Sequence, residues 1–381
     1  MIYLDHAATT PIPAPVAEEM MTALTQFANP SAQYPMGQEA KKQVEERRAV
    51  IAKALRCASE CVHFTSCGTE SDNWAIMGAL HHNRHVGKHI ITTAVEHSAI
   101  LETCKALQQQ GYEVTYLKPD KTGHVTAAQV EAALREDTVL VSVMLVNNET
   151  GALYDIDSAA RTVRAIAPDA LIHCDAVQGF LRQNLPRVSC GIDMISVSAH
   201  KIHGPKGVGA LIVSPAVIKR RALSPVIYGG GQEEGLRSGT ENLIGIAGFG
   251  KAATEGRLAF TANAEKLKSL YLYTTARLAE CGVVLNIPEN HVDHIISLTL
   301  PNIKSQTMLN FLSAKGICVS SGSACSSHDK KISPSLRAFG LSDKAADSTI
   351  RVSLCAENTR EDLDSLVAAL ELGIRYLVKI K

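Results

Sequence analysis

Short, nearly continuous apolar runs alternate along most of the chain with segments whose apolar residues recur at helical spacing. Short runs this rich in β-branched residues are typical of strands buried on both faces of a parallel sheet. The predicted strands are 61–65, 89–93, 113–117, 139–146, 170–174, 194–199 and 208–213, and the predicted helices between them include 98–110, 126–136 and 157–167. The pattern predicts an α/β fold with a mostly parallel, seven-stranded sheet.

The pattern changes after residue 250. A long helical stretch over 250–280 leads to an apolar run at 294–301, and a shorter α+β arrangement ends in a helix near 361–378. A chain of 381 residues exceeds the size at which one hydrophobic core stops growing, so two domains are expected. The predicted domains are a large one over 16–250 and a smaller C-terminal one over 251–381, with residues 1–15 packed against the smaller.

The composition is that of an ordinary globular protein, with 46% apolar and 20% charged residues and a formal net charge of zero. A balanced charge argues against a nucleic-acid or membrane-surface partner that binds mainly by electrostatics. The opening MIYLDHAATT lacks the regions of a signal peptide, and no apolar run approaches the ~20 residues that span a bilayer. We expect a soluble, cytoplasmic protein that contacts neither nucleic acid nor membrane directly.

The ten cysteines include no C-x-x-C pair, so their spacing predicts neither a disulfide framework nor a zinc site. Cys325 differs from the others because it lies in the polar stretch VSSGSACSS and is followed by Lys330 and Lys331. Such a setting activates a thiol as a nucleophile, although an incidental surface cysteine is the alternative. The run HHNRHVGKH (81–89) has no standard ligand spacing. We interpret it as a solvated helix end and loop, and we predict no metal site.

The strongest local motif is SVSAHKIHGPKGVGAL, in which a buried strand ends at Ser198 and leads to His200 and Lys201. A lysine at such a strand end, beside small and hydroxyl residues, is placed for a lowered pKa and for nucleophilic chemistry. The alternative is a solvated loop lysine.

In ALIHCDAVQ, Asp175 ends an apolar strand, where an unpaired carboxylate is costly. It either meets a buried cation, such as a cofactor pyridinium, or caps the following helix; Gln178 lies one turn further.

Three further motifs place candidate residues at expected strand ends or inside strands. In FTSCGTESDNWAI, Gly68 and Thr69 open a helix, whose amides and dipole bind phosphate unless they are merely capped. The motif is not a P-loop, because the Gly-Lys-Ser/Thr ending is missing. Arg351 lies within an apolar strand and should face a carboxylate of the chain or of a substrate. His97 follows the strand 89–93, where it stacks on a flat ring, shuttles protons or caps a helix.

Together these motifs resemble the cysteine desulfurases of the NifS/IscS type, which are pyridoxal-5′-phosphate (PLP) enzymes of fold type I in the class-V aminotransferase family. The resemblance covers essentially the whole chain. The motifs that carry it, in family order, are YLDHAATTP, FTSCGTESDN, VEHSAI, VNNETG, DAVQ, SAHKIHGPKG, GGGQEEGLRSGTEN, GSACSS and IRVSL.

The resemblance implies a role for each matching residue. PLP would be carried as a Schiff base on Lys201, which also moves the Cα proton, and His97 would stack on the ring and take part in proton transfers. Cys325 would receive the sulfur. The implied cofactor-binding residues are Gly68, Thr69, His97, Asn148, Asp175 (at the pyridine nitrogen), Gln178, Ser198, His200, Lys201 and Thr240, the last from the partner subunit of a homodimer. Asn148 and Arg351 would bind the substrate carboxylate.

The activity implied by the resemblance is a sulfurtransferase reaction that converts L-cysteine to L-alanine. The Cys325 persulfide would then donate sulfur to a protein acceptor, for iron–sulfur cluster assembly or another sulfur transfer. A selenocysteine lyase and a desulfurase dedicated to tRNA or DNA thio-modification are alternatives on the same scaffold. A PLP aminotransferase that does not use Cys325 and a non-catalytic sulfur-trafficking protein are more distant ones.

The sequence departs from the family pattern at three positions. Cys67 and Cys355 stand where glycine is usual, and His6 stands where asparagine is common. We expect Cys67 to be a packing residue and not a second sulfur carrier. The long polar stretch 326–336 predicts a mobile loop that holds Cys325 away from the cofactor at rest.

Overall fold

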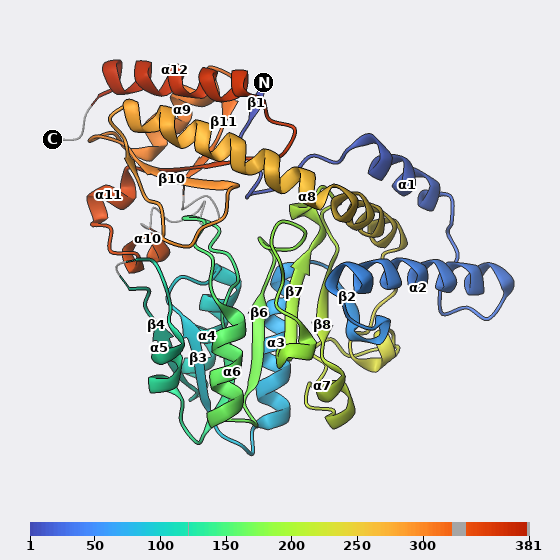
Figure 1. The fold of residues 1–381 in the computed structure, drawn as a ribbon. Coiled ribbons are helices and arrows are strands. Elements are labelled where there is room, and N and C mark those ends of the chain that lie inside the picture. Colours follow the sequence, from blue (N-terminus) through green and yellow to red (C-terminus); the bar gives the residue numbers. More distant parts are fainter. Residues whose placement is uncertain (121, 322–332, 379–381) are drawn as a thin grey trace.

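The computed structural model describes residues 1–120, 122–321 and 333–378 (Figure 1). Its centre is a seven-stranded sheet with the order β2-β8-β7-β6-β5-β3-β4. The strands are β2 (Val62–Thr65), β3 (His89–Thr93), β4 (Glu113–Leu117), β5 (Thr138–Ser142), β6 (Leu171–Asp175), β7 (Met194–Ser198) and β8 (Gly209–Val213). β8 is antiparallel to both of its neighbours, and the other neighbouring pairs are parallel. The predicted mostly parallel sheet is confirmed.

Helices cover both faces of this sheet. Successive strand residues point to opposite faces, so a strand that is apolar throughout needs helices packed on both sides. Ile90 of β3 belongs to a core with the apolar faces of α3 and α4, whereas Ile91 belongs to a second core with α2, α6 and the start of α8. The helices of this part are α1 (Ala14–Leu24), α2 (Pro35–Leu55), α3 (Gly68–Asn83), α4 (Ser98–Gln109), α5 (Ala127–Ala133), α6 (Ile156–Ile166) and α7 (Pro215–Arg220).

Two predictions from the apolar pattern were wrong in detail. The strand expected over 139–146 ends at Ser142, after which the backbone of Leu145 bonds both Asp175 and Tyr154. Residues 143–146 nevertheless stay buried, so hydrophobicity alone does not mark where the ladder ends. The run 81–89 is not solvated throughout, because His89 is fully buried on β3 and hydrogen-bonds Thr138 and Thr115 at 2.8 Å each.

A second, antiparallel sheet has the order β12-β13-β10-β9 and packs with α9 and α12 around its own apolar core. β1 pairs in parallel with β11, so the N-terminal residues lie against this C-terminal part of the chain. The elements are β1 (Ile2–Tyr3), β9 (Val284–Leu285), β10 (Ile295–Thr299), α9 (Ser305–Ala314), β11 (Ile317–Cys318), β12 (Ser320–Ser321), α10 (Pro334–Ala338), α11 (Asp343–Asp347), β13 (Thr349–Ser353) and α12 (Arg360–Tyr376).

The helix α8 (Leu243–Glu280) links the two sheets (Figure 1, gold). Phe249 near its start belongs to the core of the large sheet, and Leu270 and Leu278 near its end belong to the core of the second sheet. The helix is continuous through residue 250, and the domain division placed there stays a prediction. Within the described ranges, none of the helices combines the length and the apolar character needed to cross a membrane.

Candidate active site

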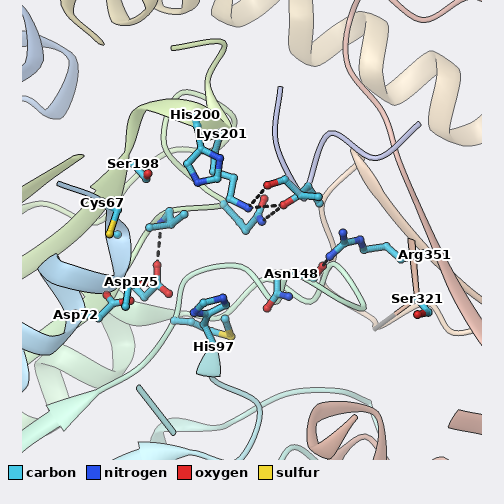
Figure 2. Close-up of a pocket in the computed structure, with 17 residues that line it drawn as sticks. Cys67, Asp72, His97, Asn148, Asp175, Ser198, His200, Lys201, Ser321 and Arg351 are labelled. Atoms are coloured by element: carbon cyan, nitrogen blue, oxygen red, sulfur yellow. Dashed lines mark hydrogen bonds between the residues drawn. The ribbon is translucent and has the colours of Figure 1, made fainter. Parts of the chain in front are cut away.

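A pocket of ≈ 280 Å³ opens beyond the carboxyl ends of β6 and β7, where α/β sheets bind their ligands (Figure 2). Ten of the predicted site residues line it: Gly68, Thr69, His97, Asn148, Asp175, Gln178, Ser198, His200, Lys201 and Arg351. Thr240 is exposed and does not line this pocket. Cys325 lies outside the described residues, as do residues 326–332 of the loop predicted to be mobile. The end of that predicted loop is wrong, because Ser333 caps α10 and residues 334–336 belong to this helix. The pocket therefore unites the predicted site except for Thr240 and Cys325.

Lys201 ends a short 3-10 turn directly after β7, so its side chain enters the pocket from the strand end. Its Nζ donates to the carbonyl oxygens of Ala7 at 2.6 Å and Ala8 at 2.8 Å, the contacts drawn as dashed lines in Figure 2. The lysine is half-buried and is not the solvated loop residue of the alternative interpretation. Sequence reasoning gave Ala7 and Ala8 no role, because a backbone acceptor leaves no trace in residue type.

Asp175 is the last residue of β6 and is buried at the floor of the pocket. Its Oδ1 accepts the N–H of Val177 at 2.9 Å. The alternative that Asp175 caps a following helix is wrong, because residues 177–182 form turns and this hydrogen bond lies at their start. Burial raises the pKa of Asp175 above its ordinary value, despite that hydrogen bond. A cation placed against this carboxylate would offset its desolvation, which is the environment that a pyridinium nitrogen requires.

A second buried acid, Asp72, lies beside Asp175 and was not predicted (Figure 2). Burial, and then the nearby Asp175, raise the pKa of Asp72 well above its ordinary value. The neighbouring His173, 3.7 Å away, cannot supply a positive charge, because burial lowers its pKa to about 3. Two buried carboxyl groups that share one site cannot both ionise cheaply, so Asp72 keeps its proton while Asp175 takes the charge. Asp72 follows Gly68 by one helical turn, a spacing that places both on one face.

His97 precedes α4 and its Nδ1 accepts the N–H of Ala99 at 3.2 Å. The helix-capping role is therefore present. In the neutral tautomer this bond leaves the proton on Nε2, and the ring lines the pocket opposite Lys201 (Figure 2). The imidazole can cap the helix and face a bound ring at the same time.

The end of the pocket lined by Gly68, Thr69, Ser198 and His200 has groups that can bind phosphate, and it is called the phosphate cradle below. Gly68 and Thr69 form the first turn of α3, whose preceding residue Cys67 makes no side-chain capping hydrogen bond. The Ser198 hydroxyl is buried without a hydrogen-bond partner in the described part of the chain. Burial, and then Lys201, lower the pKa of His200 to about 4, so it is neutral near pH 7. Amides at a helix N-terminus and a spare hydroxyl suit a phosphate group.

We expect Gly68→Ala to weaken cofactor binding by roughly tenfold, because a Cβ there would lie 2.8 Å from Val177 Cγ2 and overpacking costs about 1–3 kcal/mol. Titrating the apoprotein with PLP measures this loss. The double variant Gly68→Ala/Val177→Ala removes the clashing methyl groups and should recover most of the affinity. A double variant as weak as the single one would show that the lost contact is with the phosphate itself.

Arg351 on β13 enters the pocket from the second sheet. Its Nη2 donates to Asp5 Oδ1 at 2.8 Å and its Nη1 to the Asn148 carbonyl at 2.7 Å. Its Nε has no partner among the described residues. Arg351 was expected to face a carboxylate either of the chain or of a substrate. The structure shows that it faces one of the chain's own, Asp5.

Two further buried acids, which the sequence analysis missed, lie beside the predicted residues. Glu149, next to Asn148, accepts the Ser333 hydroxyl at 2.7 Å, and burial raises its pKa to about 7. Glu96, next to His97, accepts the Thr93 hydroxyl at 2.7 Å, and burial raises its pKa to about 8.

The pKa of Glu96 predicts a pH dependence of stability. The folded protein keeps this proton up to about pH 8, whereas a solvated glutamate loses it near 4.5, so the stability that Glu96 contributes falls as the pH rises between these values. Glu96→Gln stays neutral and keeps an oxygen for Thr93 and for the amide of Met144, which Glu96 accepts at 2.9 Å. We expect its Tm to exceed that of the wild-type apoprotein by about 2–4 °C at about pH 9, with little gain at about pH 5. The exposed Glu131→Gln is the control, and an equal gain at both pH values would contradict the prediction.

Comparison with known proteins starts from the sequence profile described as "Aminotransferase class-V", which matches residues 2–366. The chain belongs to the class-V aminotransferase family. A member from Bacillus subtilis (strain 168), "Putative cysteine desulfurase IscS 1", is 40% identical over 367 residues, which are 95% of each chain. "Cysteine desulfurase IscS" of Methanosarcina thermophila is 39% identical, over 96% of this chain and 90% of the relative.

Solved structures superpose on nearly the whole chain. A "NIFS-LIKE PROTEIN" gives a TM-score of 0.92 at 35% identity and covers 99% of this chain and 100% of that one. "SspA in complex with cysteine" gives 0.83 at 34% identity and covers 94% and 100%. These matches confirm the resemblance to the NifS/IscS type and the fold-type-I architecture.

PLP is the cofactor of this class-V family. The pocket suits it in three respects that the coordinates show. Asp175 is a buried carboxylate whose charge a cation would offset, and the half-buried amine of Lys201 lines the same pocket. The hydroxyl of Ser198 and Oε1 of Gln178 are buried and unpaired in the described residues.

Proposed function

We propose that this protein is a cysteine desulfurase that converts L-cysteine to L-alanine and carries the sulfur as a persulfide on Cys325. The observation that carries the proposal is the meeting of Lys201, Asp175 and His97 with a phosphate cradle in one pocket. Relatives named cysteine desulfurase match it over nearly their full length, and one structural neighbour is titled as a complex with cysteine.

PLP bound here would supply an electron sink for the pair of electrons released when the Cα proton leaves. The Asp175 carboxylate would hold the proton on the pyridine nitrogen, and neutral Asp72 behind it adds no competing charge. His97 would face the ring, and the amides of Gly68 and Thr69 would bind the phosphate. Lys201 Nζ, directed by the Ala7 and Ala8 carbonyls, would remove the Cα proton and return it to the product.

The substrate carboxylate would bind between Asn148 and Arg351. Cys325 would act as a thiolate, because a thiol is a poor nucleophile. Its sulfur attacks the substrate sulfur, the S–S bond forms as the C–S bond breaks, and the bonding electrons return to carbon, which is then protonated. One cysteine and one thiol thus become one alanine and one persulfide.

We further propose a cytoplasmic homodimer with a large domain over 16–250 and a smaller one formed by 251–381 and 1–15. In the dimer Thr240 would complete the partner's phosphate site. An exposed Thr240 that is absent from its own chain's pocket supports this arrangement. The persulfide would pass to a protein acceptor, such as an iron–sulfur scaffold.

The test is to incubate the PLP-loaded enzyme with L-cysteine and to quantify alanine, enzyme-bound persulfide and keto acid. Alanine and persulfide in equal amounts are expected. Keto acid in place of alanine would establish an aminotransferase. A parallel assay with L-selenocysteine tests the lyase alternative, which requires a clear preference for the selenium substrate.

A further inference from the structure

The segment 229–242, called the Thr240 loop below, lies between α7 and α8 in the chain and contacts α2 and the edge strand β2 of the large sheet. Its backbone takes up conformations that an isolated chain avoids. Glu233 and Glu234 have positive φ values of 50° and 58°, beside Gly231 at 82° and Gly239 at 118°. Non-glycine residues rarely adopt this region, so side-chain contacts must hold the loop in shape.

The first such contact is a buried ion pair between Glu233 and Arg48 of α2. Arg48 Nη1 and Nη2 donate to the two carboxylate oxygens of Glu233, at 2.7 and 2.8 Å, and Glu233 also accepts the N–H of Phe64 on β2 at 2.8 Å. Both residues are less than a tenth exposed. This paired and hydrogen-bonded geometry is the one in which a buried ion pair offsets its desolvation. It fixes the first half of the loop to α2 and β2.

The second contact fixes the other half of the loop to the phosphate cradle. Arg237 donates from Nε to Glu70 Oε1 at 2.7 Å and from Nη2 to Oε2 at 3.1 Å, and Glu70 also accepts the N–H of Ser66 at 2.8 Å. Both side chains are largely buried. Glu70 directly follows Thr69 in the first turn of α3. Arg237 in turn lies three residues before Thr240. This ion pair therefore joins the two elements that are expected to bind phosphate.

The charge of Glu70 gives Arg237 a second effect. Although burial raises it, the hydrogen bonds from Arg237 and Ser66 hold the pKa of Glu70 below its ordinary value, so the group is anionic. An uncompensated carboxylate in this turn would repel a phosphate bound at the same helix end. Arg237 cancels that charge while it binds the loop.

We propose that Arg237 and Glu70 are positioning residues, whose ion pair joins the phosphate cradle of one protomer to the Thr240 loop that completes the cradle of its partner. The proposal rests on the homodimer proposed above. Neither Glu70 nor Arg237 lines the pocket. A protomer whose pair is broken would therefore lose affinity for PLP mainly at the partner's site.

The test uses the double variant Glu70→Gln/Arg237→Met, which removes the pair without leaving an unpaired charge beside the cradle. The matched control is Arg135→Gln, which breaks an exposed pair with Asp137 near β4, at the opposite edge of the sheet. Titrating the apoproteins with PLP should show about a tenfold weaker affinity for the double variant, the loss expected for a bidentate charged pair, and no change for the control. Adding Thr240→Val to the double variant should weaken binding no further than Thr240→Val alone, because both act on one contact.

Mixed dimers locate the effect. One copy carries Lys201→Ala, so the absorption of lysine-bound PLP reports only the other copy's site. When the Lys201→Ala copy carries the pair substitutions, the PLP affinity of the other, reporting copy should fall about tenfold. When the reporting copy itself carries them, its own PLP affinity should change by less than about twofold. Faster amide hydrogen exchange across 229–242 in the variant apoprotein is expected as well, and unchanged exchange there would count against a positioning role.

The outcomes separate this inference from the proposal on which it rests. If the chain is monomeric by light scattering, or if Thr240→Val on the Lys201→Ala copy has no effect, the proposed dimer site fails and the inference fails with it. If Thr240→Val weakens the partner's site but the pair substitutions do not, only the inference is overturned. A loss confined to the reporting copy would also overturn it.

Discussion

Lys201→Ala is expected to abolish alanine formation, with turnover lower by on the order of 10³-fold or more. The substitution removes the amine that hydrogen-bonds the Ala7 and Ala8 carbonyls at the pocket. In the proposed mechanism this amine provides both the covalent attachment of the cofactor and the base that takes the Cα proton. The measurements are alanine release from L-cysteine and the absorption band of lysine-bound PLP. Both should be lost together.

Lys206→Ala is the matched control, since Lys206 is exposed in the same Gly/Pro-rich loop. It should retain the cofactor band and wild-type turnover. A Lys201→Ala enzyme that still released alanine at a comparable rate would remove the lysine from the mechanism. Loss of activity in both variants would point to damage to the loop instead.

Cys325→Ala is expected to leave PLP binding intact while lowering desulfurase turnover by more than about 10³-fold, because no other group would take the sulfur. The contrasting variant is Cys67→Ala. Cys67 lines the pocket and precedes α3, which makes it the one described cysteine placed near the cofactor site. We expect Cys67→Ala to retain turnover within about threefold, since a half-buried packing residue loses little on truncation to alanine.

Persulfide content by mass spectrometry after incubation with L-cysteine distinguishes the two cysteines. The additional sulfur atom should be present in Cys67→Ala and absent in Cys325→Ala. The opposite pattern would make Cys67 the sulfur carrier. A Cys67→Ala enzyme that binds PLP but lacks all activity would likewise contradict the packing role.

The apolar pattern predicted most of the large sheet, because strands buried on both faces must be apolar throughout. β3 and β4 begin and end at the predicted residues. The strand predicted over 139–146 was too long, since Val143 and Leu145 remain buried after the ladder ends. Likewise α8 begins at Leu243 and not at 250, because the Asn242 side chain caps it seven residues earlier than the apolar pattern indicated.

The candidate site was predictable where chemistry depends on a side chain at a strand end, as for Lys201 and Asp175. It was not predictable where a backbone group acts, as for Ala7 and Ala8. Asp72 was missed because an acid inside a helix is usually solvated, and only the packed structure shows that it is 1% exposed and beside Asp175. The ion pair that links Glu70 to Arg237 spans 167 residues, and no local pattern marks such a contact.

The placement of the N-terminus has a consequence for biosynthesis. Ile2 and Tyr3, which are translated before the large sheet, pair with β11, and the amide of Ala7 donates to the Ser353 hydroxyl, 346 positions later. A growing chain can fold its large sheet as that sheet emerges, but the N-terminal segment cannot dock until β13 has left the ribosome. Lys201 therefore acquires the Ala7 and Ala8 carbonyl acceptors only after β13 has been made. Cofactor capture then follows the synthesis of β13 and the docking of the N-terminal segment.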